Sequence, residues 1–205
     1  MLTLDLALHC GWALLARGCP LHRAQPLVIE CGMLRLTAHE TRRFTNLAVQ
    51  FEELLDLHRP ALVLIEQNFV FRNVRSTAAL NQLQGLIRYL CATAYGGLGV
   101  DVAMVDNNTS KKFVLGSTQY WNGEAYVGVT KDMLETGVRA VLCGDCVLPA
   151  VGDHDAFDAI AIGLAYYDAP LVPAALARRP IPPKAPKTPR LTRVAGTHKG
   201  VSRGL

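Results

Sequence analysis

The sequence predicts one α/β domain in which helices flank a mixed β-sheet, with the elements in the order βββαβαβα. Three short apolar runs separated by turn residues fill positions 2–36 and predict three consecutive strands. A continuous apolar run at 61–65 lies between two segments with helical spacing of apolar residues. Half of the 205 residues are hydrophobic and 19% are charged, which suffices for a single core.

The first predicted strand carries an acid. Apolar residues alternate with polar ones over positions 2–6, which places Asp5 in the middle of the strand, and further strands are predicted at 11–16 and 27–36. A charge buried there without a partner costs several kcal/mol, on the order of the penalty known for buried ions. We therefore expect a compensating group beside Asp5.

The next two elements place a second acid at the end of a strand. From 41 to 57 apolar residues recur every three or four positions, as on an amphipathic helix that Pro60 ends. The run at 61–65 then predicts a strand buried on both faces, and it stops at Glu66.

A helix at 76–94, closed by Gly96-Gly97, and a strand at 100–105 follow. Asn108 or Thr109 is expected to cap a short helix that runs to 114.

The remaining part of the core is predicted to be partly irregular. Residues 116–128 mix glycines with Tyr120, Trp121 and Tyr126, which indicates a surface loop or small insertion whose aromatic side chains contact a partner. Thr130 is expected to cap a helix that ends near Leu142. The last predicted helix covers 155–167.

The charge distribution separates the core from a tail. Positions 1–169 hold thirteen Lys and Arg against all seventeen Asp and Glu, whereas 170–205 hold eight Lys and Arg, seven of the eleven prolines and no acid. Such a composition cannot bury enough apolar surface to offset the entropy of ordering. We expect a core domain at 1–168 with an insertion at 117–129, and a disordered basic tail at 169–205 that attracts a polyanion.

The compartment predicted is the cytoplasm. The N-terminus lacks a basic segment followed by an apolar one, and the longest uncharged apolar run near the C-terminus, 159–167, has nine residues against the ~20 that a membrane span needs. The six cysteines lie mostly in apolar patterns, as in a reducing compartment. Cys143 and Cys146 have the spacing of zinc ligands, but no second pair matches them, so structural zinc is not favoured.

Four separated acids predict a metal site. Asp155 and Asp158 are three positions apart and share a helix face, and in a βββαβαβ order the strands of Asp5 and Glu66 can be neighbours. Each acid alone is more often a solvated charge or a cap, so only the joint pattern is informative. Oxygen ligands favour Mg²⁺ or Mn²⁺, and a pair of such ions suits phosphodiester hydrolysis without a small-molecule cofactor.

Several motifs resemble one family over about residues 1–168. These are Leu4-Asp5 with Gly11-Trp12-Ala13, residues 64–67 with Phe69, Arg72-Asn73-Val74 and Ser76, residues 81–85, and residues 155–162. The chain resembles RuvC-like Holliday-junction resolvases, which are nucleases of the ribonuclease H-like superfamily, and in its divergence it is most similar to phage-type members. The resemblance implies a ribonuclease H-like fold in the cytoplasm of a bacterium or of a phage-infected host.

The resemblance also implies roles for individual residues. Asp5, Glu66, Asp155 and Asp158 would be the metal-binding catalytic acids. Lys111 and Lys131 would approach DNA phosphates, Phe69 would act near the junction centre, and the helix from Ser76 would form a homodimer interface. Basic residues from the same segments could offset phosphate charge around the acids: Arg72, Arg75, Arg88, Lys111, Lys112 and Lys131. Phe69 and Phe71 could stack on an unpaired base.

The sequence departs from the family pattern at three places. The family usually has Asp-Pro-Gly where this chain has Asp5-Leu6-Ala7. About ten extra residues are present in the stretch 117–130. The long tail has no counterpart in compact members of the family. Asp153 and His154 are alternative metal ligands beside Asp155, but Asp155 is favoured because it shares a helix face with Asp158.

The expected function is Mg²⁺-dependent nicking of two strands of a four-way or other branched DNA by a symmetric dimer, leaving 5′-phosphate and 3′-hydroxyl ends. Alternatives are cleavage of flaps, forks or RNA–DNA hybrids at the same centre, and a catalytically silent junction-binding protein. Residues 5–12 also resemble the phosphate-binding hairpin of actin-like and sugar-kinase-like proteins, but no second lobe or further glycine-rich loop follows.

Overall fold

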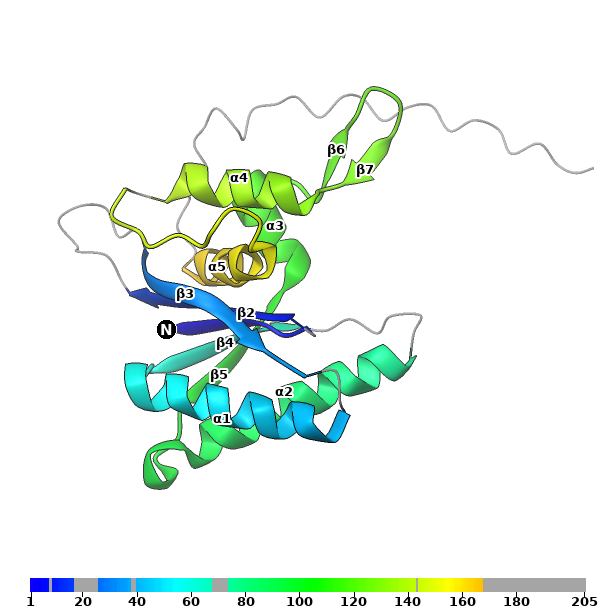
Figure 1. The fold of residues 1–205 in the computed structure, drawn as a ribbon. Helices are drawn as coiled ribbons and strands as arrows, with labels where there is room; N and C mark the ends of the chain where they lie inside the picture. Colours follow the sequence, from blue (N-terminus) through cyan, green and yellow to red (C-terminus); the bar gives the residue numbers. More distant parts are fainter. Residues whose placement is uncertain (8, 17–25, 38–39, 68–73, 143, 168–205) are drawn as a thin grey trace, which may run out of the picture.

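A five-stranded mixed sheet forms the centre of the protein (Figure 1). The structure is a computed structural model, and it describes residues 1–7, 9–16, 26–37, 40–67, 74–142 and 144–167. The strand order is β3-β2-β1-β4-β5. The elements are β1 Leu2–Asp5, β2 His9–Ala16, β3 Leu27–Arg35, α1 Glu40–His58, β4 Leu62–Gln67, α2 Val74–Gly97, β5 Asp101–Asp106, α3 Asn107–Leu115, β6 Gln119–Trp121, β7 Tyr126–Gly128, α4 Lys131–Val141 and α5 His154–Tyr166.

The sheet combines an antiparallel meander with two parallel strands. β1 pairs antiparallel with β2, and β2 with β3, whereas β1, β4 and β5 run parallel. The predicted βββαβαβα order is confirmed, as is the adjacency of the strands that carry Asp5 and Glu66. Parallel neighbours end at the same edge of the sheet, so the two acids lie side by side.

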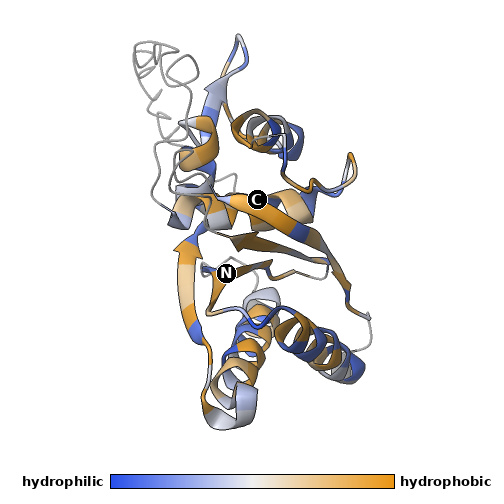
Figure 2. Ribbon diagram, turned by 90° about the vertical axis from the view of Figure 1, so that its left-hand side faces the viewer, coloured by the Kyte–Doolittle hydropathy of each residue, from blue (hydrophilic) through white to orange (hydrophobic). Residues whose placement is uncertain are grey.

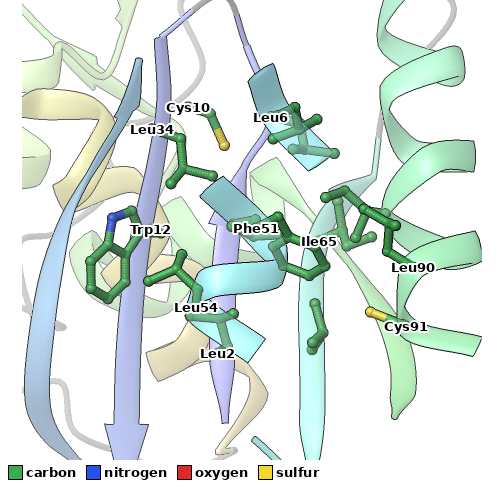
Figure 3. Packing of buried hydrophobic residues seen from close by; sticks show 14 of the residues in the cluster. Leu2, Leu6, Cys10, Trp12, Leu34, Phe51, Leu54, Ile65, Leu90 and Cys91 are labelled. Atoms are coloured by element: carbon green, nitrogen blue, oxygen red, sulfur yellow. The ribbon is translucent and has the colours of Figure 1, made fainter. Parts of the chain in front are cut away.

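Helices cover both faces of the sheet, α1 and α2 on one and α5 on the other, with α3 and α4 packed against α5 (Figure 1). The strands of the five-stranded sheet are mostly hydrophobic, whereas α1 and α2 mix hydrophobic and hydrophilic residues (Figure 2). The apolar stripes of α1 and α2 bury Phe51, Leu54 and Leu90 against Leu2 and Ile65 of the sheet (Figure 3). These contacts fix the strand ends from which the acids project.

α5 crosses the other face of the sheet at close range. Phe157, Ile160 and Leu164 are fully buried with Leu15 of β2 and Val28 of β3. This second core holds the helix that carries Asp155 and Asp158.

Two local predictions are wrong, and a third element is more regular than expected. Asp5 is the last residue of β1, not a mid-strand residue, because β1 stops there. The N-cap of α3 is Asp106 and not Asn108 or Thr109, because the helix already begins at Asn107. The carboxylate of Asp106 accepts the backbone N–H of Asn108 at 2.6 Å. The stretch predicted as a surface loop or small insertion contains a short hairpin, β6–β7, in which Trp121 and Tyr126 pair across two three-residue strands.

Other boundaries follow the sequence closely. Thr130 caps α4 and accepts the N–H of Met133 at 3.3 Å, as predicted. The backbone of α2 leaves helical angles at Ala94, and positive φ values at Gly96 and Gly97 end the element. Within the described part of the chain, no helix is both long enough and apolar enough to span a bilayer. The predicted tail at 169–205 lies outside the described residues.

Candidate active site

Four acidic side chains meet at one edge of the sheet. Asp5 ends β1, Glu66 is near the end of β4, and Asp155 and Asp158 lie in the first turns of α5. Carboxylate oxygens of Asp5, Asp155 and Asp158 lie within 4.8 Å of one another, and Glu66 hydrogen-bonds Asp5 through its side chain. All four line an open cavity of about 220 Å³. We refer to these four side chains as the acid cluster.

Two contacts position the strand ends of the acid cluster. Gln84, a buried residue of α2, donates its amide N–H to the backbone carbonyl of Glu66 at 2.8 Å. Gly11 lies opposite Asp5 in the β1–β2 register, and a Cβ atom on it would lie 1.9 Å from the carbonyl oxygen of Asp155. Only a residue without a side chain allows α5 to approach the sheet this closely, which brings Asp155 to Asp5.

Burial and mutual repulsion raise the pKa values of two of the acids. Burial raises the pKa of Asp5 well above its ordinary value, and the hydrogen bond that its protonated carboxyl donates to Glu66 and the negative charges of the other acids raise it further. Burial likewise raises the pKa of Asp158 to about 6, although the ammonium groups of Lys131 and Lys111 act in the opposite direction. The site therefore holds ionised carboxylates only against a free-energy penalty, which a bound cation would remove.

Lys131 supplies positive charge to the acid cluster. Its ammonium group donates a hydrogen bond to Asp155 and lies 3.9 Å from the Oδ2 of Asp158. Burial lowers its pKa, but the hydrogen bond and charge of Asp155 outweigh burial and leave the pKa raised. The oxygens that the ammonium group contacts are carboxylate oxygens, which are the donors that hard divalent ions such as Mg²⁺ or Mn²⁺ prefer.

The other residues predicted to bind DNA are placed as follows. Lys111 lines the same cavity, whereas Lys112 is exposed on α3 outside the cavity lining. Arg75 is exposed in the first turn of α2. Phe69 and Arg72 lie outside the described residues.

The departure at Leu6-Ala7 leaves Asp5 in the acid cluster. Leu6 is buried in the core, and Ala7 lines the cavity. Asp5 thus keeps its place without the proline and glycine that usually follow it in the family.

His154 points to a different set of partners. Its Nε2 lies 3.4 Å from Asp132, and its Nδ1 lies 3.5 Å from Glu135. Glu135 is buried, accepts the Nε–H of Arg139 at 3.0 Å and accepts the N–H of Gly152 at 3.3 Å. These contacts tie α4, which carries Lys131, to the start of α5, which carries Asp155.

Two positioning residues of the site were not identified from the sequence. Gly11 belongs to a motif used for the resemblance, but its role depends on how α5 packs over β2. Glu135 lies on the buried face of α4 beside Leu134 and Val138, and that apolar spacing was the available signal. A carboxylate within an apolar stripe requires a buried partner.

The fold and the acid cluster together define a ribonuclease H-like α/β domain with an acidic centre. No protein-family model matches the chain. Among solved structures, the chain has the fold of RuvC. The Thermus thermophilus RuvC structure is 19% identical with a TM-score of 0.59, and the match covers 82% of this chain and 93% of that one. T. thermophilus RuvC in complex with Holliday junction substrate is 16% identical with a TM-score of 0.58, and the match covers 81% and 90%.

A partial sequence match is also to a RuvC protein. Over 67 residues the chain is 34% identical to the crossover junction endodeoxyribonuclease RuvC of Synechococcus sp. (strain RCC307). The aligned segment covers 32% of this chain and 42% of that relative, which is less than half of its length. The predicted fold class and the resemblance to RuvC-like resolvases are confirmed.

Proposed function

We propose that the protein is a metal-dependent, structure-selective endodeoxyribonuclease that resolves Holliday junctions or other branched DNA by paired nicks. The observation that carries the proposal is the convergence of Asp5, Glu66, Asp155 and Asp158 at an open cavity beside two lysines. The RuvC fold supports it, because T. thermophilus RuvC with this fold is in complex with Holliday junction substrate.

The chain's residues divide the work at the scissile phosphate. The four acids would hold divalent ions, Mg²⁺ or Mn²⁺, which when bound supply activation of water and neutralisation of charge on the phosphodiester. Lys111 and Lys131 flank the cavity, and each would hold a phosphate oxygen and so fix the position of the strand. The products would be 5′-phosphate and 3′-hydroxyl ends.

The proposed assembly is a homodimer through α2, since paired nicks match two-fold symmetry. Gly85 lies in the middle of α2 and is exposed, and a Cβ on it would meet nothing within 4 Å in this chain. A glycine inside a helix lowers stability by about 1 kcal/mol relative to alanine. Close approach of a partner helix would account for its presence. Sedimentation velocity of wild type and Gly85→Leu tests this: we expect dimer and monomer, respectively, and two identical profiles would remove the interface from α2.

The nuclease proposal is tested by cleavage of a synthetic four-way junction with a titration of Mg²⁺ and Mn²⁺. We expect Glu66→Gln to lower the cleavage rate more than about a hundredfold, because it removes an expected metal ligand. The matched control is Glu53→Gln, an exposed carboxylate on α1. Equal rates for wild type and Glu66→Gln would contradict the assignment.

The same assay separates the proposal from its competitors. Faster cleavage of flaps, forks or RNA–DNA hybrids at one salt concentration would keep the centre and change the substrate. Junction binding that is insensitive to EDTA, without cleavage in either metal, would indicate a silent binding protein.

A further inference from the structure

An aromatic pair is exposed on the hairpin β6–β7. Trp121 of β6 and Tyr126 of β7 contact edge to face, with ring centroids 5.3 Å apart and an interplanar angle of 61°. The two side chains remain 44% and 39% exposed. The alternation of side chains along a strand puts both rings on one face of the hairpin, and Tyr120 and Val127 on the other.

The hairpin holds the two rings in a defined position. The side chain of Asn122 accepts the backbone N–H groups of Glu124 at 2.9 Å and Ala125 at 2.8 Å, which closes the turn. At the base of the hairpin, the N–H of Val129 donates to the carbonyl of Thr118 at 3.1 Å. The backbone that carries the rings is therefore closed at both ends of the hairpin, so a partner that binds the rings has less backbone freedom to remove.

The hairpin continues the wall of the cavity that holds the acid cluster. β7 ends at Gly128, and the next two residues, Val129 and Thr130, line that cavity. Tyr126 and Thr130 are four residues apart, which is at most about 14 Å of extended chain, or about four base-pair steps of DNA. Figure 1 shows β6–β7 projecting beyond α4.

The residues of the hairpin suit a base better than a phosphate. Between Ser117 and Thr130 the chain has no Lys or Arg and one acid, Glu124, at the turn. The cations that suit phosphates, Lys111 and Lys131, lie in the cavity instead. Exposed aromatic rings near lysines that can hold the backbone phosphates are an arrangement with which proteins stack unpaired bases.

We propose that Trp121 and Tyr126 form a stacking platform for an unpaired base of the DNA strand that enters the acid cluster. This rests on the proposed function, because it requires DNA at that cavity. In the sequence, the two rings are far from Phe69, the residue that the resemblance assigns to the junction centre. They lie in the stretch where the sequence departs from the RuvC pattern. It selects branched over linear DNA, since a branch point supplies bases that are free to leave the helical stack.

The first test uses Trp121 as its own reporter. The chain has two tryptophans, and Trp12 is 7% exposed, so Trp12→Phe leaves Trp121 as the single tryptophan, whose emission is excited at a wavelength where the tyrosines do not absorb. In EDTA, to prevent cleavage, a four-way junction with unpaired central bases is expected to quench this emission, and a linear duplex of the same sequence to quench it much less. Unchanged emission with junction that a gel shift shows to be bound would overturn the platform.

The second test measures junction affinity as a function of salt. Trp121→Leu is expected to weaken binding about five- to a hundredfold, from loss of one stacked base, without changing the slope of log affinity against log salt. Lys111→Gln is expected to reduce that slope by about 1, since it removes a phosphate contact. Trp121→Phe keeps a stacking ring and should retain most of the affinity, which separates stacking from a loss of hairpin structure.

A matched control and the remaining outcomes complete the design. Tyr166 is 47% exposed in the last turn of α5, and Tyr166→Leu should leave affinity unchanged. Wild-type affinity in Trp121→Leu would overturn the platform and leave a cross-strand contact or a protein partner as the role of the rings. Quenching and a Trp121 effect on affinity, without cleavage in either metal, would support the platform and contradict the nuclease proposal. Absence of junction binding would overturn both.

Discussion

Asp158→Asn is expected to stabilise the protein in the absence of metal. The pKa of Asp158 rises from 3.8 to about 6 on folding, chiefly through burial. The folded state therefore binds more protons than the unfolded state between these values, and stability falls as pH rises through this window. At 1.36 kcal/mol per pKa unit, the ionised carboxylate lowers the free energy of unfolding by roughly 3 kcal/mol above pH 6. Asparagine does not ionise and avoids this loss.

The measurement is urea and thermal unfolding in EDTA at pH 4 and pH 8. At pH 8 we expect the variant to be more stable by roughly 3 kcal/mol, or about 6–12 °C in Tm for a chain of this size. At pH 4 the difference should nearly vanish, because the wild-type carboxyl is then largely protonated in the folded state. The control Glu53→Gln removes an exposed carboxylate and should change stability by less than about 0.5 kcal/mol at either pH.

Adding Mg²⁺ should reverse the order. A ligand present at a thousand times its Kd stabilises the folded state by about 4.1 kcal/mol, which exceeds the difference of roughly 3 kcal/mol in EDTA. Wild type should gain this amount, whereas the variant, which lacks one of the expected ligands, should gain much less. A variant that is no more stable than wild type at pH 8, or equally stabilised at pH 4 and pH 8, would refute the electrostatic account of the acid cluster.

Three further predictions concern the supports of the site. Glu135→Ala leaves Arg139 and the N–H of Gly152 without this buried acceptor, so urea unfolding should show a loss of about 3 kcal/mol, with no change for the exposed Glu124→Ala. Gly11→Ala places a methyl group against the Asp155 carbonyl and should push α5 away from the sheet, which lowers stability by about 1–3 kcal/mol or more. Because Asp155 then moves away from Asp5, calorimetry should show weaker Mg²⁺ binding. Lys131→Gln should lower the salt slope of junction binding by about 1 in titrations at several salt concentrations, and an unchanged slope would exclude a phosphate contact.

Much of the fold follows from local patterns in the sequence. The continuous apolar run at 61–65 and the helical spacing at 41–57 each describe one element, and β4 and α1 lie there within one or two residues. The hairpin was missed because each strand has three residues, too few for alternation to be visible. The contact of Trp121 with Tyr126 helps to hold the hairpin together. It forms only when the two strands pair, so the pattern of either strand alone does not reveal it.

The site divides in the same way. The i,i+3 spacing of Asp155 and Asp158 places both on one helix face, and the order of the strands brings Asp5 beside Glu66, so the acid cluster was predictable. The pairing of Lys131 with Asp155 was not, since it spans 24 positions and depends on how α4 docks against α5. The roles of Phe69 and Arg72 stay predictions, because both lie outside the described residues.

The charges that line the cavity indicate what the acid cluster is for. Four carboxylates face two ammonium groups there, Lys111 and Lys131, so the lining would carry a net charge of −2 if every group were ionised. The raised pKa values of Asp5 and Asp158 show that the chain itself does not neutralise this excess. Ionisation of either acid opposes folding, so folding alone does not explain the acids. One divalent cation would neutralise this excess negative charge of the lining. A phosphate bound by the lysines would add further negative charge, which a second divalent cation could neutralise.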